Sequence, residues 1–294
     1  LKTKPTQHSV KELRSLGISP DVLVCRSEQE LPKDEKNKIA LFCSVPAKSV
    51  VSMHDVDTVY SIPILLNKQK VDDTILKKLN LKIKKPNLND WKRVVKAKLL
   101  PEKEVNVSFV GKYTELKDSY KSINEALEHA GIQNKAKVNI NFVEAEQITS
   151  KNVRKVLKKS DAILVPGGFG ERGIEGMILA CKYARENNVP YLGICLGMQI
   201  AIIEYARNVL KLKSANSTEF DSSTKFPVIG LITEWSDISG KKEKRTKNSD
   251  LGGTMRLGGQ VCKLKKKSNS YKMYKKSEII ERHRHRYEVN PNYK

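Results

Sequence analysis

Short apolar runs alternate with amphipathic, helix-like stretches along the second half of the chain. The predicted strands cover residues 105–110, 138–143, 161–165 and 189–193, and the predicted helices follow them at 117–130, 152–158, 176–186 and 200–210. Four such repeats predict an open, doubly wound parallel sheet whose ligand-binding loops lie at the carboxyl ends of its strands. A further strand is predicted at 227–232.

The first 85 residues predict a second, separate α/β unit. The pattern predicts a polar loop at 2–9, a short helix at 10–16 and an apolar strand at 20–25. A charged helix at 33–38 and two more strands at 39–43 and 50–53 follow. Residues 86–102 hold several prolines and asparagines around one amphipathic segment, which predicts a linker containing a helix. We therefore expect three parts, at 1–85, 86–102 and 103–294, which suits a length of 294 residues.

One turn in the second unit predicts a nucleophile. The apolar strand that ends at Gly193 runs into Ile194, Cys195, Leu196 and Gly197, and a helix-like segment follows. Strand, tight turn and helix in this order form a nucleophile elbow, here with cysteine in place of serine. The helix N-terminus is expected to favour the thiolate. The alternative is an inert core cysteine, but both glycines are in place for the turn.

A cysteine nucleophile also needs an oxyanion hole and a base. The segment Pro166 to Gly170 follows a neighbouring predicted strand, and its backbone N–H groups are free to approach a developing oxyanion, although an ordinary turn would have the same composition. The histidines are at positions 8, 54, 129, 283 and 285. None of them is a convincing partner for Cys195, so the residues alone leave the base unidentified.

The charge and the cysteine content of the chain limit which classes of partner we expect. The net charge of +22 suggests nucleic acid, but lysines outnumber arginines and only 6% of residues are aromatic, whereas base readout uses arginine and aromatic rings. Dispersed lysines favour a solvated surface and phosphate-rich small ligands. The five cysteines stand singly, and no signal peptide or apolar run of about 18 residues is visible. We expect a reduced, cytoplasmic protein that binds neither nucleic acid nor membrane.

The motifs around the elbow resemble a known family. Gly193 to Gln199, together with Pro166 to Gly170, is similar to the glutaminase site of class I (triad) glutamine amidotransferases. Four further stretches resemble CTP synthases over nearly the whole chain, at residues 2–7, 215–220, 250–258 and 281–290. The resemblance implies a flavodoxin-like amidotransferase sheet preceded by the C-terminal part of a synthetase (amidoligase) domain, with both units incomplete.

The resemblance also implies an activity in pyrimidine nucleotide biosynthesis. The family is a ligase: ATP phosphorylates the 4-oxygen of UTP, and ammonia from glutamine displaces the phosphate to give CTP. GTP activates the enzyme, CTP inhibits it, Mg²⁺ is required, and the complete enzyme is a homotetramer. These ligands are expected to be the partners of this chain.

Site residues follow by resemblance. Cys195 is the nucleophile that forms a glutamyl thioester, and the glutamine-binding positions are Gly168, Leu196, Gly197, Met198, Gln199, Glu219 and Arg286. Gly168 and the Leu196 amide fit the oxyanion hole, and Glu219 suits the substrate ammonium. The UTP and CTP positions are Lys2, Thr3, Lys4, Pro5, Thr6, Gln7 and Lys38, and the ATP positions are His54, Asp55 and Val56. The family usually has lysine or arginine where His54 stands.

Some family features are missing from the chain. It contains no His-x-Glu, whereas the family has a catalytic His-Pro-Glu, and it contains no phosphate loop of the GxxxxGK[ST] type. We expect these parts and the Mg²⁺ ligands to lie beyond Lys294 and before Leu1, in a longer protein. His283 and His285 then belong to the substrate loop, and this chain alone should neither hydrolyse glutamine nor make CTP. The alternatives are another class I amidotransferase or cysteine hydrolase, or a basic nucleic-acid-binding module; the first 85 residues favour the CTP synthases.

Overall fold

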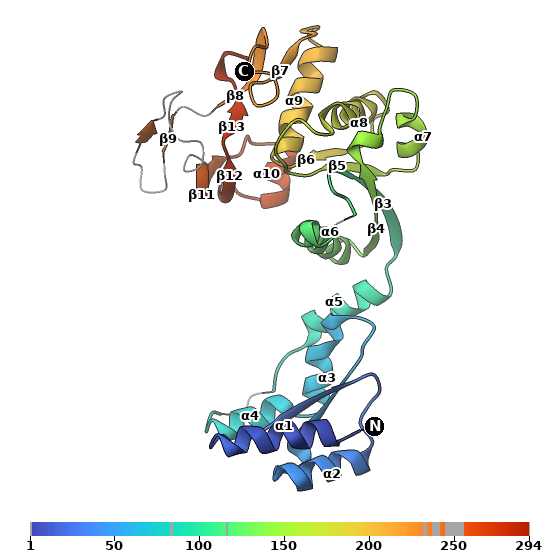
Figure 1. Ribbon diagram of the computed structural model, residues 1–294, viewed down its shortest axis with the longest axis vertical. Coiled ribbons are helices and arrows are strands. Elements are labelled where there is room, and N and C mark those ends of the chain that lie inside the picture. Colours follow the sequence, from blue (N-terminus) through green and yellow to red (C-terminus); the bar gives the residue numbers. More distant parts are fainter. Residues whose placement is uncertain are drawn as a thin grey trace. The chain divides into compact units, whose positions relative to one another are not determined.

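A computed structural model describes residues 2–82, 85–115, 117–231, 234–236, 242–244 and 256–293 (Figure 1). The chain divides into two compact units, one of residues 1–104 and 125–138 and the other of residues 105–124 and 139–294. Both units are mixed α/β with parallel strands, as the sequence predicts. Among the described residues, no helix is long and apolar enough to cross a membrane.

The first unit is built on one strand–helix–strand motif. Strands β1 (Leu23–Ser27) and β2 (Val50–His54) pair in parallel, and α2 (Lys33–Cys43) connects them. Helix α1 (Lys4–Ser15) packs on α2, where Arg14 donates a hydrogen bond to the Ser44 hydroxyl. The core between these elements is made of Val10, Cys25, Leu31, Ile39, Ala40, Cys43, Val45 and Val50.

Two predictions for this unit are wrong. Residues 39–43 form the second half of α2 rather than a strand, because Ile39, Ala40 and Cys43 are buried on one helix face while the side chains between them are exposed. The expected loop at 2–9 is mostly helical as well, since α1 begins at Lys4 with Pro5 in its first turn, where proline is well tolerated.

The stretch of the first unit before residue 104 also contains short helices. They are η1 (Ala47–Ser49), η2 (Val59–Ser61), α3 (Ile62–Lys68), α4 (Val71–Lys78) and α5 (Asn89–Leu99). Helix α5 confirms the helix expected within the linker. The linker bounds themselves stay a prediction.

The second sheet has the order β4-β3-β5-β6, with strands at Ala136–Glu144, Lys103–Gly111, Ala162–Val165 and Tyr191–Gly193. Strands β3, β5 and β6 run parallel; the first pairing begins with Val107 opposite Ala162, and the second begins with Ile163 opposite Tyr191. The helices of this part are η3 (Lys117–Tyr120), α6 (Lys121–Gln133), η4 (Ala145–Gln147), α7 (Val153–Leu157), α8 (Ile174–Glu186) and α9 (Leu196–Asn208). This is the predicted strand–helix alternation.

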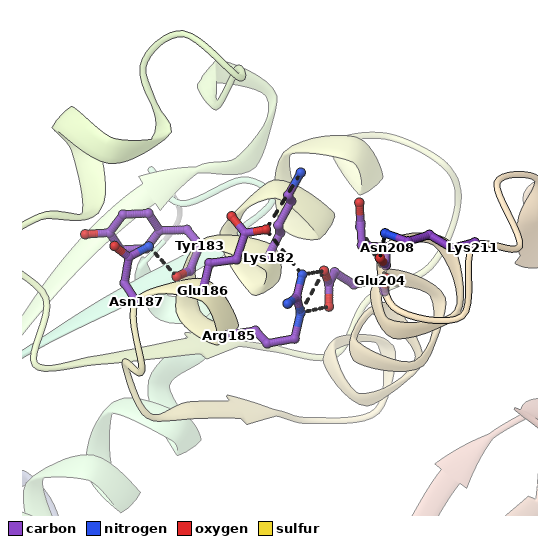
Figure 2. Close-up of polar contacts among 8 residues, drawn as sticks. All are labelled: Lys182, Tyr183, Arg185, Glu186, Asn187, Glu204, Asn208 and Lys211. Atoms are coloured by element: carbon purple, nitrogen blue, oxygen red, sulfur yellow. Dashed lines mark hydrogen bonds and ion pairs between the residues drawn. The ribbon is translucent and has the colours of Figure 1, made fainter.

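Helices α8 and α9 pack against each other and share an ion pair between the partly exposed Arg185 and the buried Glu204. Figure 2 shows the Arg185 guanidinium of α8 facing the Glu204 carboxylate of α9, with N–O distances of 2.8–3.2 Å. The Glu204 side chain is 2% exposed, so Arg185 supplies the countercharge that its burial requires.

The C-terminal part forms smaller sheets. Strands β7 (Ala215–Ser217), β8 (Phe226–Leu231) and β13 (Tyr287–Val289) make a three-stranded sheet in the order β13-β8-β7. The antiparallel pairs are β9 (Glu234–Ser236) with β10 (Lys242–Lys244) and β11 (Arg256–Lys263) with β12 (Glu278–His285), and the remaining helices are α10 (Asn269–Tyr274) and η5 (Pro291–Tyr293). Most of the predicted motif at 250–258 lies outside the described residues.

Candidate active site

The elbow adopts an unusual backbone conformation at its centre. Cys195 lies between β6 and α9 as the N-cap of α9, with φ 53° and ψ −102°. A positive φ at a non-glycine residue costs on the order of 1–3 kcal/mol and persists only where the surroundings impose it. The conformation predicted from the motif is thus present, and the packing around it must supply the compensation.

Gly193 and Gly197 permit a close approach between strand and helix. A Cβ at Gly193 would lie 2.3 Å from the carbonyl carbon of Gly197, and a Cβ at Gly197 would lie 2.1 Å from the Val165 carbonyl oxygen. Both distances are far below contact distance, so neither position accepts a side chain without a shift of the backbone. The Ile194 amide also donates a 2.9 Å hydrogen bond to Val165, which ties the turn to β5.

The glycine-rich segment after β5 lies against this turn. The Cβ position of Gly167 is 3.5 Å from the Cys195 Cβ, and that of Gly168 is 3.2 Å from a Leu196 methyl carbon. The two segments that sequence reasoning paired as nucleophile and oxyanion hole are therefore neighbours. Gly168 and Leu196, the two predicted oxyanion donors, are in contact range of each other.

One peptide of the glycine-rich segment is fixed at both ends. The Phe169 carbonyl accepts a 3.0 Å hydrogen bond from the buried Lys112 ammonium, which also donates to Gly170 at 2.6 Å. The N–H of the same peptide, at Gly170, donates to the Glu219 carboxylate at 2.9 Å. Lys112 was not among the predicted site residues; its position directly after β3 and Gly111, at a strand end, was the available signal.

Predicted glutamine-binding residues come together around this turn. Gln199 donates a 3.2 Å hydrogen bond to the Tyr287 carbonyl, and the Arg286 guanidinium lies 5.9 Å from the centre of the Phe169 ring. The Oε1 atom of Gln199 and the Nε atom of Arg286 are buried without a hydrogen-bond partner. A buried polar atom without a partner is costly, so these two atoms are suited to a polar ligand.

The thiol is less acidic than the sequence suggests. Burial raises the pKa of Cys195, a hydrogen bond from the Leu196 amide lowers it, and the charge of Glu219 raises it again. Burial is the largest of these effects, so the expected preference for the thiolate at the helix N-terminus is outweighed. A base is accordingly needed to activate the thiol.

His283 and His285 are engaged elsewhere. Glu288 lies 2.7 Å from the His285 ring and 2.5 Å from the Arg256 guanidinium, and these contacts, the His285 hydrogen bond first, lower the pKa of Glu288 to about 2. Burial lowers the pKa of His283. In the part of the chain that the structure describes, no hydrogen bond joins a histidine to Cys195.

The predicted nucleotide residues of the first unit lie on two packed helices and at one strand end. Within Lys2–Gln7, the Gln7 amide donates to the Thr3 hydroxyl at 3.1 Å, which fixes the start of α1, and Lys38 is exposed on α2. His54 ends β2, and the Asp55 amide donates to the Ser27 carbonyl at 3.1 Å. The predicted ATP residues therefore lie at the carboxyl ends of parallel strands, where α/β sheets bind ligands.

Over the described ranges, no group of three or more histidine, cysteine, aspartate or glutamate side chains is placed to hold a metal ion.

Comparisons with known proteins relate both units to other sequences. The family "Glutamine amidotransferase class-I" matches residues 115–294, and "CTP synthase N-terminus" matches residues 1–81. Among solved structures, the chain is similar to "Trypanosoma brucei CTPS - glutaminase domain with bound acivicin", with 39% sequence identity and a TM-score of 0.56. This match covers 64% of the present chain and 69% of the trypanosome chain.

Proposed function

This chain belongs to the class I glutamine amidotransferases and, within them, to the CTP synthases, and on that basis we propose that Cys195 is the nucleophile that releases ammonia from glutamine to aminate UTP. The observation that carries the proposal is the contact between the elbow and the glycine-rich segment. The Cβ position of Gly167 is 3.5 Å from the Cys195 Cβ, and that of Gly168 is 3.2 Å from a Leu196 methyl carbon, which supports a nucleophile next to its oxyanion donors.

The chemistry follows from these positions. The Cys195 sulfur attacks the side-chain carbonyl carbon of glutamine, and the Leu196 and Gly168 amides stabilise the oxyanion. The carbon–nitrogen bond then breaks, the thiol proton passes through a base to the leaving ammonia, and water hydrolyses the glutamyl thioester. Glu219 accepts from the substrate ammonium, and Arg286 binds its carboxylate. By resemblance to the family, the base is a histidine of a His-x-Glu pair, which this sequence does not contain.

The first unit is proposed to bind the nucleotides. Exposed lysines, Lys2, Lys4 and Lys38, suit triphosphates as mobile point charges, so we assign Lys2–Gln7 and Lys38 to UTP and to CTP as inhibitor. His54, Asp55 and Val56 are assigned to ATP, which phosphorylates the uracil 4-oxygen before ammonia displaces the phosphate. The reaction makes the parent enzyme a carbon–nitrogen ligase. Activation by GTP, the Mg²⁺ requirement, the homotetramer and a cytoplasmic location stay predictions.

Equilibrium dialysis of the 294-residue chain tests this assignment. We expect saturable UTP binding that CTP displaces, together with no appreciable glutaminase or CTP-forming turnover, because the sequence lacks His-x-Glu and a phosphate loop. Absence of UTP binding alongside a glutamine-sensitive Cys195 would favour another amidotransferase. Tight, steeply salt-dependent binding to any duplex instead of UTP would favour a nucleic-acid-binding module.

A further inference from the structure

The phenol of Tyr191 spans the elbow. Tyr191 opens β6 four residues before Cys195, and its hydroxyl donates a 2.8 Å hydrogen bond to the carbonyl oxygen of Gly197, two residues after Cys195. The hydrogen bond closes a ring of chain that contains the nucleophile. It therefore connects the strand that enters the elbow directly to the first turn of the helix that leaves it.

The Gly197 carbonyl, which accepts this hydrogen bond, belongs to the most tightly packed part of the turn. A Cβ at Gly193 would lie 2.3 Å from the Gly197 carbonyl carbon and 2.4 Å from its oxygen. The Gly197 carbonyl thus fits only because Gly193 has no side chain, and the Tyr191 hydroxyl holds this same carbonyl. If the first turn of α9 moved away from β6, this hydrogen bond would break and the contact with Gly193 would open.

The surroundings keep the hydroxyl protonated and in place. Burial raises the pKa of Tyr191, and a hydrogen bond with the Cys181 thiol and the nearby charge of Glu204 raise it further. The phenol therefore stays a donor across the physiological pH range. Further along α9, the Arg185–Glu204 ion pair fixes the helix to α8, so α9 is attached at two separate points.

We propose that Tyr191 is a positioning residue, which holds Cys195 in its positive-φ conformation by tethering the first turn of α9 to β6. Tyr191 does not touch the reacting atoms; it acts through the Gly197 carbonyl. Only the chloroketone measurement depends on the proposed function, because it assumes that Cys195 reacts with a glutamine analogue. The tether itself is a property of the fold and has an independent readout.

The test compares wild type with Y191F, which keeps the ring and removes the donor, and with Y183F as the matched control on α8. Hydrogen exchange measured by mass spectrometry reports on the amides of Gly197, Met198 and Gln199, which bond to Ile194 and Cys195. The concentration dependence of Cys195 alkylation by a glutamine chloroketone, followed by mass spectrometry, gives the maximal alkylation rate and, separately, the half-saturating concentration.

For Y191F we expect exchange at these amides to rise about three- to tenfold, as loss of one hydrogen bond implies, and the maximal alkylation rate to fall by a similar factor. The half-saturating concentration should stay within about twofold, and Y183F should match wild type. Para-aminophenylalanine at position 191 restores a donor and should restore both values, which also covers the case in which Y191F folds poorly.

Unchanged exchange in Y191F, or an equal rise in Y183F, would overturn the tether. A raised half-saturating concentration with an unchanged maximal rate would overturn it as well, because Tyr191 would then act on binding. Failure of the chloroketone to label the wild-type Cys195 would count against the proposed function, whereas the exchange result would still decide the tether.

Discussion

The elbow around Cys195 and the nucleotide-binding residues around Lys38 are built differently. Cys195 is held by its own helix and by hydrogen bonds and contacts with β5 and β6, and Gly193 and Gly197 on either side of it admit no side chain. Lys38 is exposed on α2, and the conformation of its backbone is that of an ordinary helix. The elbow fixes the position of the Cys195 sulfur, whereas the residues around Lys38 supply positive charge.

This difference follows from the chemistry. Attack on a carbonyl carbon requires a defined geometry between nucleophile and oxyanion donors, so the backbone itself is constrained and leaves glycines at fixed spacing in the sequence. Phosphate binding by lysine tolerates several geometries, because the ammonium is a point charge on a flexible stem. A region of the first kind should be damaged by one added methyl group, and a region of the second kind should lose affinity gradually.

Gly193→Ala should have the largest effect. Its Cβ would lie 2.3 Å from backbone atoms of Gly197, so the strand and helix must separate. We expect the free energy of unfolding to fall by at least about 3 kcal/mol and the chloroketone reaction of Cys195 to slow by about 100-fold. Chemical denaturation and intact-protein mass spectrometry measure the two effects.

Gly230→Ala is the matched control, since nothing lies within 4 Å of the Cβ position of that glycine in β8. It should leave both quantities close to wild type. If Cys195 reacted as fast in Gly193→Ala as in Gly230→Ala, the elbow would not be a rigid region.

Arg185→Ala should have the second-largest effect, on the free energy of unfolding. It leaves the Glu204 carboxylate, 2% exposed, without its countercharge, and we expect a loss of about 2–3 kcal/mol in the free energy of unfolding. The control is Lys78→Ala in the first unit, where the pair with Asp21 is more than half exposed on both sides and is worth at most about 0.5 kcal/mol. Equal losses from both variants would contradict a stabilising role for the Arg185–Glu204 pair.

The sequence predicted the elbow well because its signal is local. The spacing of Gly193, Cys195 and Gly197 reports directly on the close strand–helix approach that the structure contains. The strand–helix order of the second unit was predictable for the same reason, since each element shows its own periodicity.

Features that depend on tertiary packing were missed. The apolar run at 39–43 has no periodicity that separates a strand from a buried helix segment, and only the packing of α1 on α2 decides it. The helix predicted at 117–130 continues past residue 130, and Gly131 lies inside α6. Lys112 and Tyr191 act through contacts with residues that a single sequence does not pair with them.

Lys38→Ala should have a smaller effect, on affinity alone. Removal of one mobile charge should weaken UTP binding about five- to tenfold at low salt and less at high salt, without a change in melting temperature. Lys33→Ala, at the start of the same helix, is the control and should bind as wild type does. An equal loss in both variants would show a general charge effect rather than a site.

The last predicted effect concerns acid stability and appears only below about pH 4.5. Because the pKa of Glu288 is lowered from 4.5 to about 2 in the folded chain, its contribution is complete above pH 4.5 and is lost as the pH falls towards 2. The wild type should therefore lose stability over that window more steeply than Glu288→Gln. Urea unfolding at pH 6, 4.5 and 3 measures this slope, and parallel slopes would contradict the contacts with His285 and Arg256.

The most direct test of the central claim is protection of Cys195 by glutamine. The 294-residue chain is treated with a glutamine chloroketone at increasing glutamine concentration, with asparagine as the control, and each cysteine is quantified by peptide mass spectrometry. We predict that Cys195 is modified before the other four cysteines and that glutamine, but not asparagine, protects it in a saturable way. Modification of Cys195 and Cys262 at equal rates, or no protection by glutamine, would contradict the assignment of Cys195 as the glutamine-binding nucleophile.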